Sequence, residues 1–444
     1  MNNEISRRDF LKLAGAASLA VLVPKGIMRN HKTTLAVKPW TVTGYQVPEL
    51  ASFDNTLQNF MQSRNIPGGA LAVTRNGRLV LARGYTYSDD AQDLLVQPTS
   101  LFRIASMTKP VTAAAILQLV QEGRLSLNDK LTHLLTLAPP AGQTADNRLG
   151  SITVRNLLQH LGGWDAGQAF DPMFRDAIIS AALGQPLPIS QANIMTYMTG
   201  QPLQHNPGTT YAYSNYGYLL LGRIISAVTG QSYPEYIRQK VFAPLAVTRP
   251  ILGRSLSVYR LTSEAKYHSQ FTAPTVFDGS GAIVPSPYGG WNLENMDSHG
   301  GWLASAIDLA RFASSFDTPA TCPILNPASI ATMFGLPENI PPASYNPGDW
   351  YYACGWLVRN WGGGNRNTWH DGSLPGTYAL FVRRESDHTT WCVLFNQRDD
   401  ASGLSYSDID DALHAAANAV TNWPTHDLFS EYLTKSVYLP LVVR

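Results

Sequence analysis

The pattern of apolar and polar positions predicts strands near both ends of the chain. Two alternating runs in IPGGALAVTRNGRLVLARGY are joined by Asn76-Gly77, so we expect a β-hairpin from about Ala70 to Arg83. Two more strand-like runs, Tyr378 to Arg384 and Thr389 to Asn396, are separated by a polar turn. A helical pattern, SDIDDALHAAANAVTNW, follows them.

The stretch FRIASMTKPVTAAAILQLVQEGRLSL, from Phe102 to Leu127, has the apolar period of a helix, with Ile116 and Val120 on its apolar face. Pro110 is tolerated in a first helical turn, and Gly123 favours the helix end. We expect this helix to be central and buried.

Between about Asn128 and Trp302 the chain is rich in Pro, Gly and short helical patterns, such as TVRNLLQHL and GYLLLGRIISAVTG. Strands at both ends with helices between them predict an α/β (α+β) domain that a helical insertion interrupts. The expected parts are an amino-terminal segment (1–36), α/β regions (about 45–105 and 300–430), a helical insertion (about 106–299) and a short apolar tail (431–444) that is either a packed segment or a processing signal.

The composition narrows the class of protein. With 444 residues, 44% of them apolar, the chain can bury a substantial interior, and we expect two subdomains. A net charge of +1 without a basic stripe argues against nucleic acid and against electrostatic membrane docking, so the partner should be small or uncharged. The 3 cysteines allow at most one disulfide, and we interpret them as small buried hydrophobes. No His-Glu-x-x-His motif or clustered His/Cys pattern calls for a metal, and nothing requires a cofactor.

The amino-terminal residues match a twin-arginine export signal. SRRDFLK carries the pair Arg7 and Arg8, and an apolar stretch from Leu13 to Val23 follows. That stretch falls short of the roughly 20 residues that a membrane-spanning helix needs, and no other segment is long and charge-free enough. We therefore expect an exported protein, located in the periplasm, the cell envelope or outside the cell, with no stable span in the mature chain. The alternative is a basic, uncleaved amphipathic start.

Ser106 and Lys109 form a Ser-x-x-Lys motif at the amino end of the predicted central helix. Residues three apart on a helix lie on one face within reach of each other, which suits a nucleophile and its base. Lysine can act as a base only if burial, the helix dipole or a polar neighbour lowers its pKa. The motif alone is weak, because Ser263 and Lys266 repeat it where no helical face follows, and there we expect an exposed loop serine.

Two further clusters carry candidate chemistry. Tyr213 and Asn215 stand in an extended turn before a helical pattern, where side chains two apart point the same way and could face one cleft. His370-Asp371-Gly372-Ser373 leads into a predicted strand, where the glycine allows close approach of a substrate and the next backbone N–H could stabilise an oxyanion.

Taken in order, these motifs resemble the penicillin-recognising serine hydrolases: class C β-lactamases, D,D-carboxypeptidases, D-aminopeptidases and β-lactamase-like esterases. The resemblance runs from about Pro67 to Phe395 and includes LLQHLGG and GGWLASAIDLARF. It implies a β-lactamase/transpeptidase-like fold, an antiparallel sheet flanked by helices with a mostly helical inserted subdomain. It also implies a small ester, amide or short peptide as substrate.

The resemblance implies a role for each candidate residue. Ser106 would form an acyl-enzyme, with Lys109 and Tyr213 sharing the acid and base duties. Asn215 would hydrogen-bond Lys109 and the substrate, and His370, Gly372 and Ser373 would line the substrate site. The backbone N–H groups of Ser106 and Ser373 would form an oxyanion hole.

One departure shifts the expected substrate. The lactamases and carboxypeptidases usually place a lysine where His370 stands, and a largely neutral histidine should hold a substrate carboxylate less well. We therefore favour an ester or a D-amino-acid amide, with a β-lactamase or D,D-carboxypeptidase as the alternative. A non-catalytic peptide-binding relative is a second alternative. A Ser-His-Asp system built on His370 and Asp371 is disfavoured because adjacent residues project in different directions.

Overall fold

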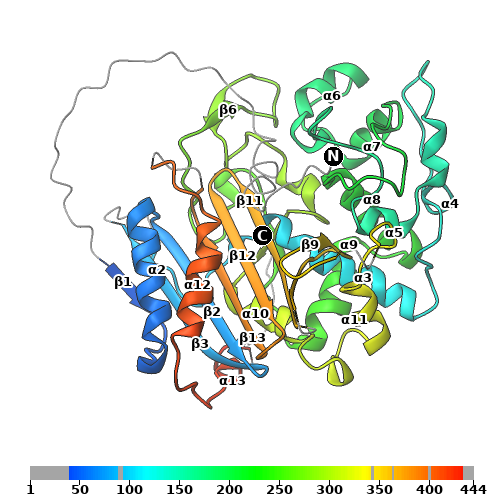
Figure 1. Ribbon diagram of the computed structural model, residues 1–444. Helices are drawn as coiled ribbons and strands as arrows, with labels where there is room; N and C mark the ends of the chain where they lie inside the picture. The colour runs from blue at the N-terminus through cyan, green and yellow to red at the C-terminus, as the bar shows by residue number, and fades with distance from the viewer. Residues whose placement is uncertain (1–39, 89–93, 342–344, 363–364, 399–401, 434–444) are drawn as a thin grey trace.

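The computed structural model describes residues 40–88, 94–341, 345–362, 365–398 and 402–433. An antiparallel sheet with its flanking helices lies beside a mostly helical region (Figure 1). The strands of the sheet follow the order β1-β3-β2-β13-β12-β11-β10-β9. Their bounds are β1 Trp40–Thr43, β2 Gly68–Arg75, β3 Arg78–Tyr87, β9 Trp350–Tyr352, β10 Leu357–Gly362, β11 Asn365–Leu374, β12 Thr377–Arg384 and β13 Thr389–Phe395.

The predicted hairpin is confirmed as β2 and β3, which turn at Asn76 and Gly77, both in the left-handed region of φ. The two predicted carboxyl-terminal strands are confirmed as β12 and β13. Strand β13 pairs with β2 in antiparallel register, from Gly69 opposite Phe395 to Arg75 opposite Thr389. The sheet therefore joins the two ends of the described chain.

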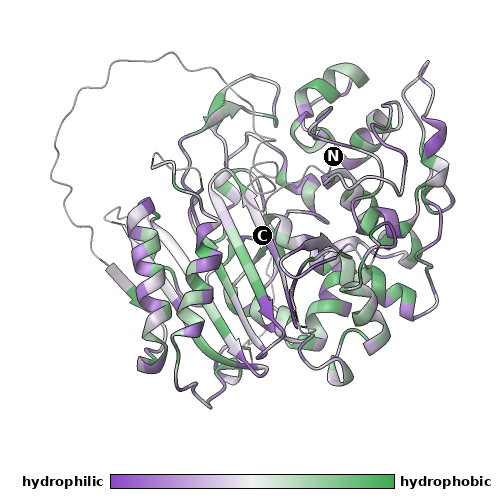
Figure 2. Ribbon diagram, viewed as in Figure 1, coloured by the Kyte–Doolittle hydropathy of each residue, from purple (hydrophilic) through white to green (hydrophobic). Residues whose placement is uncertain are grey.

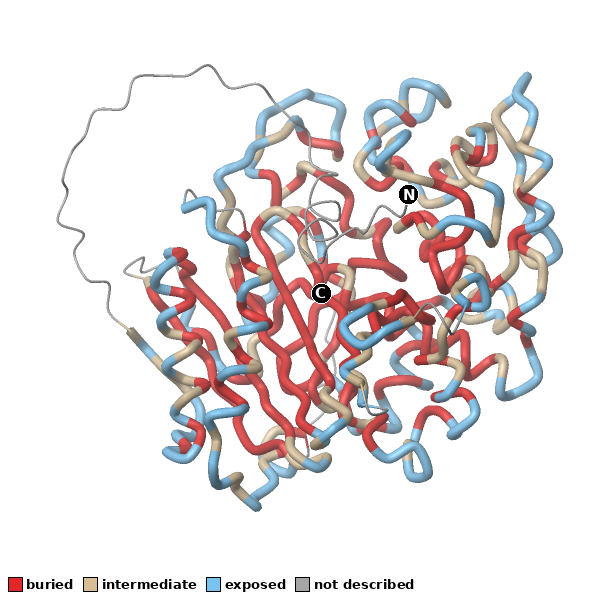
Figure 3. The backbone as a smooth tube through the Cα atoms, in the orientation of Figure 1, coloured by how far each residue is buried: buried red, intermediate tan, exposed pale blue. Residues whose placement is uncertain are grey.

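Both faces of the sheet are covered. Helices α2 (Ala51–Arg64) and α12 (Asp408–Asn418) pack on one face, and α10 (Ala306–Ser314) packs on the other (Figure 1). Side chains of β13 alternate between the two cores: Trp391 and Val393 join the core under α2 and α12, while Cys392 and Leu394 join the core under α10. Because both faces are buried, the central strands are mostly green to white in hydropathy (Figure 2) and red in burial (Figure 3).

The helical region surrounds α3 (Thr108–Gln121), which is buried along almost its whole length, as expected. Gly123 ends the helix with a φ of 69°. The other helices are α4 Leu131–Leu134, α5 Val154–Leu158, α6 Asp176–Leu183, α7 Gln191–Thr199, α8 Asn215–Thr229, α9 Tyr233–Ile237, α11 Pro327–Met333 and α13 Phe429–Leu433. Short strands complete the structure: β4 Phe102–Arg103, β5 Ile251–Leu252 and β8 Trp302–Ala304 form one sheet, and β6 Thr272–Pro274 pairs with β7 Ile283–Pro285.

Two expectations need correction. Residues 102–103 are a strand rather than the start of the helix, because they pair with β8. His370 to Ser373 lie inside β11 rather than before it, because the backbone of Gly372 pairs with Ala379 of β12.

All 3 cysteines are free; Cys354 and Cys392 are buried, while Cys322 is half-buried. No helix within the described ranges is both long and apolar enough to cross a membrane. The expected export signal (1–36) and nearly all of the expected tail (431–444) lie outside the described residues.

Candidate active site

Ser106 sits in a turn between a strand and the central helix. Strand β4 ends at Arg103, and Ala105 adopts a φ of 46°, in the left-handed region that non-glycine residues seldom occupy. A short 3-10 helix, Ala105–Met107, then leads into α3. This turn leaves Ser106 half-buried on the wall of a pocket, whereas Ser263 of the second Ser-x-x-Lys motif lies in an exposed turn, as expected.

The Lys109 side chain is fully buried, and its amino nitrogen has three oxygen neighbours. Nζ lies 3.0 Å from Ser106 Oγ, 2.7 Å from Asn215 Oδ1 and 3.2 Å from the carbonyl oxygen of His299. Burial lowers the pKa of Lys109 to about 7, while the charges of Asp171 and Asp371 oppose that shift. A neutral amine has two N–H bonds and one lone pair. Since the Asn215 and His299 oxygens can only accept, they take both N–H bonds, and the lone pair is left for the Ser106 hydroxyl.

Asp171 fixes the Asn215 amide from the other side. Asn215 Nδ2 donates to Asp171 Oδ2 over 2.6 Å, so its Oδ1 must face Lys109. Asp171 also accepts from the backbone N–H of Met173, and burial raises the pKa of its carboxyl. Our sequence analysis missed Asp171, because the motif positions carry no signal for a residue 44 positions before Asn215.

Tyr213 lies beside this pair. The Lys109 Nζ atom is 4.5 Å from the centre of the Tyr213 ring, and the phenol interacts with the Ser106 side chain. Loss of contact with water raises the pKa of Tyr213 well above its usual value. The phenol therefore holds its proton at neutral pH and could pass a proton only in concert with its neighbours.

The LLQHLGG segment packs behind the Tyr213 turn. His160 is buried, and its Nδ1 accepts from the backbone N–H of Ser214 over 3.1 Å. Its ring lies 4.4 Å from the rings of both Tyr213 and Tyr352. Burial lowers the pKa of His160 well below the usual value, so a neutral imidazole supports the turn.

His370 is buried and neutral. Burial, with the nearby charge of Lys109, lowers its pKa to about 3. His370 Nδ1 lies 2.6 Å from the backbone oxygen of Asp371, which can only accept, so Nδ1 carries the proton. Nε2 then accepts from the Tyr352 hydroxyl over 3.0 Å. The imidazole is therefore bonded to the Asp371 backbone and not, as a Ser-His-Asp system would need, to that carboxylate.

Gly372 brings strand β11 against the turn that carries Ser106. A Cβ atom at this position would lie 2.1 Å from the carbonyl oxygen of Ile104 and 3.1 Å from the backbone nitrogen of Ser106. Only glycine allows this approach. The next residue, Ser373, lines the pocket, and its Oγ accepts from Arg398 Nη1 over 2.8 Å. Our sequence analysis also missed Arg398.

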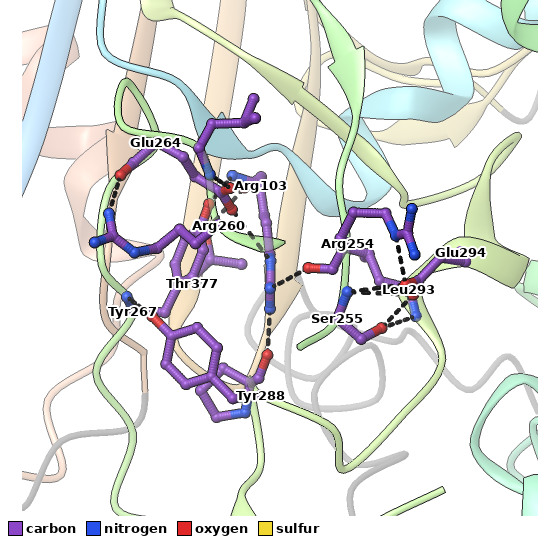
Figure 4. Close-up of polar contacts among 12 residues, drawn as sticks. Arg103, Arg254, Ser255, Arg260, Glu264, Tyr267, Tyr288, Leu293, Glu294 and Thr377 are labelled. Carbon is purple, nitrogen blue, oxygen red and sulfur yellow. Dashed lines mark hydrogen bonds and ion pairs between the residues drawn. The ribbon is translucent and has the colours of Figure 1, made fainter. Parts of the chain in front are cut away.

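A buried polar cluster around Arg103 joins the strand before Ser106 to β12 (Figure 4). Thr377 Oγ1 lies 2.9 Å from the Arg103 carbonyl oxygen and 3.1 Å from that of Phe395. The Arg103 N–H donates to the Tyr267 hydroxyl over 2.8 Å, and the guanidinium lies 4.4 Å from the Tyr267 ring centre. Glu264 is 3.8 Å from the guanidinium. The cluster thus ties the strand before Ser106 to β12, whose Thr377 pairs with Leu374, the residue after Ser373.

The pocket gathers most of the predicted residues. Ser106, Tyr213, Asn215, His370 and Ser373 line it; Gly372 shapes it from behind, and Lys109 reaches it through Ser106. The other lining residues are Ala105, Asp171, Phe174, Met296, His299, Gly300, Asp371, Leu374, Pro375 and Arg398. Within the part of the chain that the structure describes, no group of three or more His, Cys, Asp or Glu side chains could hold a metal ion.

Similarity to known proteins shows the family of the chain and its fold. A family model described as Beta-lactamase matches residues 53–416, and a model of the twin-arginine translocation signal matches residues 4–24, which indicates export across a membrane. Protein flp of Staphylococcus aureus strain MW2 is 34% identical over 347 residues, which cover 77% of this chain and 62% of that protein. In another strain, NCTC 8325, the match covers 44% of this chain and 36% of flp, so the chain spans between about a third and three fifths of these relatives.

Solved structures show the same fold. An octameric penicillin-binding protein homologue from Pyrococcus abyssi superposes with a TM-score of 0.61 and 26% identity, over 87% of this chain and 80% of that one. A D-amino acid amidase from Ochrobactrum anthropi SV3 has a TM-score of 0.61 and 22% identity, over 83% of this chain and 99% of that one. The predicted β-lactamase/transpeptidase-like fold is confirmed.

Proposed function

Because the chain belongs to the beta-lactamase family, we propose that it is an exported serine hydrolase that cleaves esters or amides through an acyl-enzyme on Ser106. One observation carries the proposal: Asn215 and His299 take both N–H bonds of neutral Lys109, which leaves its lone pair for the Ser106 hydroxyl.

The proposed reaction has two half-reactions. Ser106 Oγ attacks the substrate carbonyl carbon while Lys109, with Tyr213, accepts the hydroxyl proton. The backbone N–H groups of Ser106 and Ser373 stabilise the oxyanion. Collapse of the tetrahedral intermediate breaks the bond to the alcohol or amine, which leaves with the proton. Water then attacks the acyl-enzyme by the same route and releases the acid and free Ser106.

The substrate class that we favour follows from the segment His370-Asp371-Gly372-Ser373. A neutral His370 supplies no positive charge for a substrate carboxylate, so we favour a carboxylesterase or a D-amino-acid-specific peptidase over a β-lactamase or D,D-carboxypeptidase. The fold is shared with a D-amino acid amidase and with a penicillin-binding protein homologue, so it is compatible with this choice.

A fluorophosphonate probe tests the proposal, since it reacts with activated serines. We expect labelling of Ser106 that Ser106→Ala abolishes, and full labelling in Ser263→Ala, which removes the exposed serine of the second motif. An unmodified Ser106 in folded protein would overturn the hydrolase proposal and favour a non-catalytic binding protein. A panel of short-chain p-nitrophenyl esters, D-alanyl amides and a cephalosporin then separates the substrates; efficient turnover of the cephalosporin alone would contradict our preference.

A further inference from the structure

Among the residues of strand β11 that line the pocket (His370, Asp371, Ser373 and Leu374), only Asp371 contributes a charge. His370 contributes none, because its imidazole is neutral. Asp371 also lines the pocket and is 9% exposed. A carboxylate is thus the only charged side chain that the His370-Asp371-Gly372-Ser373 segment contributes to the pocket.

The Asp371 carboxylate lies within electrostatic range of the reacting groups. It lines the same pocket as Ser106 and Tyr213, and its charge raises the pKa of both Lys109 and Tyr213. A substrate carbonyl bound at Ser106 would therefore place its adjoining substituents within the field of Asp371.

The remaining charges of the pocket lie elsewhere on its wall. Asp171 is bonded to Asn215, behind Lys109. The guanidinium of Arg398 donates to Ser373 Oγ, on the residue whose backbone we assign to the oxyanion hole. Arg398 thus lies beside the Ser373 side chain, two residues along β11 from Asp371.

From this arrangement we infer that Asp371 is a specificity-determining residue that attracts a protonated amine near the scissile carbonyl. The inference rests on the proposed function and names its substrate class: aminoacyl amides or esters. The same carboxylate disfavours substrates that carry a carboxylate at that place. Opposite charges about 4 Å apart in partly buried surroundings attract strongly enough to change affinity by tenfold or more.

Matched ligands test this inference by binding, without turnover. In Ser106→Ala we would measure the Kd of the p-nitroanilides of alanine (each enantiomer), isobutyric acid and succinic acid, at about pH 6.5, where an α-amino group is protonated. Isobutyryl differs from alanyl only by a methyl group in place of the ammonium. We expect the better alanyl enantiomer to bind at least about tenfold more tightly than the isobutyryl compound, and the succinyl compound to bind more weakly than both.

Variants assign the preference to Asp371. In Ser106→Ala/Asp371→Asn the ratio of the isobutyryl to the alanyl Kd should fall to within about threefold of unity. The control is Ser106→Ala/Glu122→Gln, which removes an exposed negative charge at the far end of α3, about 20 Å from Ser106, and should keep the wild-type ratio.

The outcomes separate this inference from the proposed function. Equal binding of the alanyl and isobutyryl compounds, or an unchanged ratio in the Asp371→Asn background, overturns the inference even if wild-type protein hydrolyses neutral esters. Tightest binding of the succinyl compound also overturns it and assigns recognition to Arg398. Failure of the fluorophosphonate to label Ser106, with the charge preference intact, overturns the hydrolase proposal alone.

Discussion

At the scale of single residues, Lys109 controls the proposed chemistry through its protonation state. A buried ammonium would donate all three N–H bonds to Ser106, Asn215 and His299 and could not accept a proton. Burial removes that obstacle by lowering the pKa of Lys109 to about 7. The neutral amine is therefore the base, and its fraction increases as the pH rises through that value.

We predict that kcat/KM for a neutral ester rises with pH along a limb with an apparent pKa of about 7. A pH–rate profile with p-nitrophenyl butyrate measures this limb. The charge of Asp171 raises the pKa of Lys109, so Asp171→Asn should move the limb to lower pH. A limb that stays in place or moves upward in that variant would contradict the assignment.

Replacement of Lys109, the proposed base, should lower kcat/KM strongly. Lys109→Met is expected to lower kcat/KM by at least about 100-fold, the usual contribution of a general base. Lys240→Met, at an exposed lysine in the same helical region, is the matched control and should change kcat/KM by less than about twofold.

At the scale of elements, the proposed oxyanion hole depends on two segments that meet only in the folded protein. The turn with Ser106 follows β4, and Ser373 belongs to β11. Gly372 permits their approach, and the hydroxyl of Thr377 bridges the Arg103 and Phe395 carbonyl oxygens behind them. Removal of the Thr377 hydroxyl should therefore lower kcat more than it lowers the stability of the fold.

We predict that Thr377→Val, which keeps the shape and removes the hydroxyl, lowers kcat for p-nitrophenyl butyrate by about tenfold with little change in KM. Steady-state kinetics and the thermal unfolding midpoint would be measured together. Thr390→Val is the matched control, because Thr390 is equally buried and its hydroxyl has no partner in the described part of the chain. An equal loss of kcat in both variants would show that the Thr377 effect is one of general packing.

The elements differ in how well the sequence predicts them. The β2–β3 hairpin could be predicted because alternation and the Asn76-Gly77 turn are local signals. Strand β11 was harder, since Gly372 and the charged and polar residues around it interrupt any alternation. Its strand character comes from pairing with β10 and β12, which are long-range partners.

The residues of the candidate site also divide into those with a local sequence signal and those placed by long-range contacts. Serine, lysine, tyrosine and histidine motifs carry their spacing in the sequence, and the structure brings Ser106, Lys109, Tyr213 and His370 to one pocket. Asp171 and Arg398 reach the same pocket through tertiary contacts alone. Neither stands in a local motif that distinguishes it from the other aspartates and arginines of the chain, so the sequence could not have identified them.

At the scale of the whole molecule, the amino-terminal signal and the folded domain have separate functions in one chain. The signal match covers residues 4–24, and the family match begins at residue 53. Substitution of both Arg7 and Arg8 by lysine should therefore abolish export and leave the catalytic domain intact.

We predict that Arg7→Lys/Arg8→Lys protein accumulates in the cytoplasm, with fluorophosphonate labelling of Ser106 equal to that of the exported protein. Cell fractionation followed by probe labelling measures both properties. Normal export of the double variant would contradict the twin-arginine assignment, whereas unlabelled cytoplasmic protein would show that activity depends on the destination.

The pairing of β2 with β13 also constrains the order of synthesis, folding and export. The paired residues Gly69 and Phe395 lie 326 positions apart, so the central sheet cannot close until the ribosome has synthesised β13. The export signal at residues 4–24 leaves the ribosome well before that strand does. Since the twin-arginine route carries folded proteins, export through this signal must follow the pairing of β13 with β2.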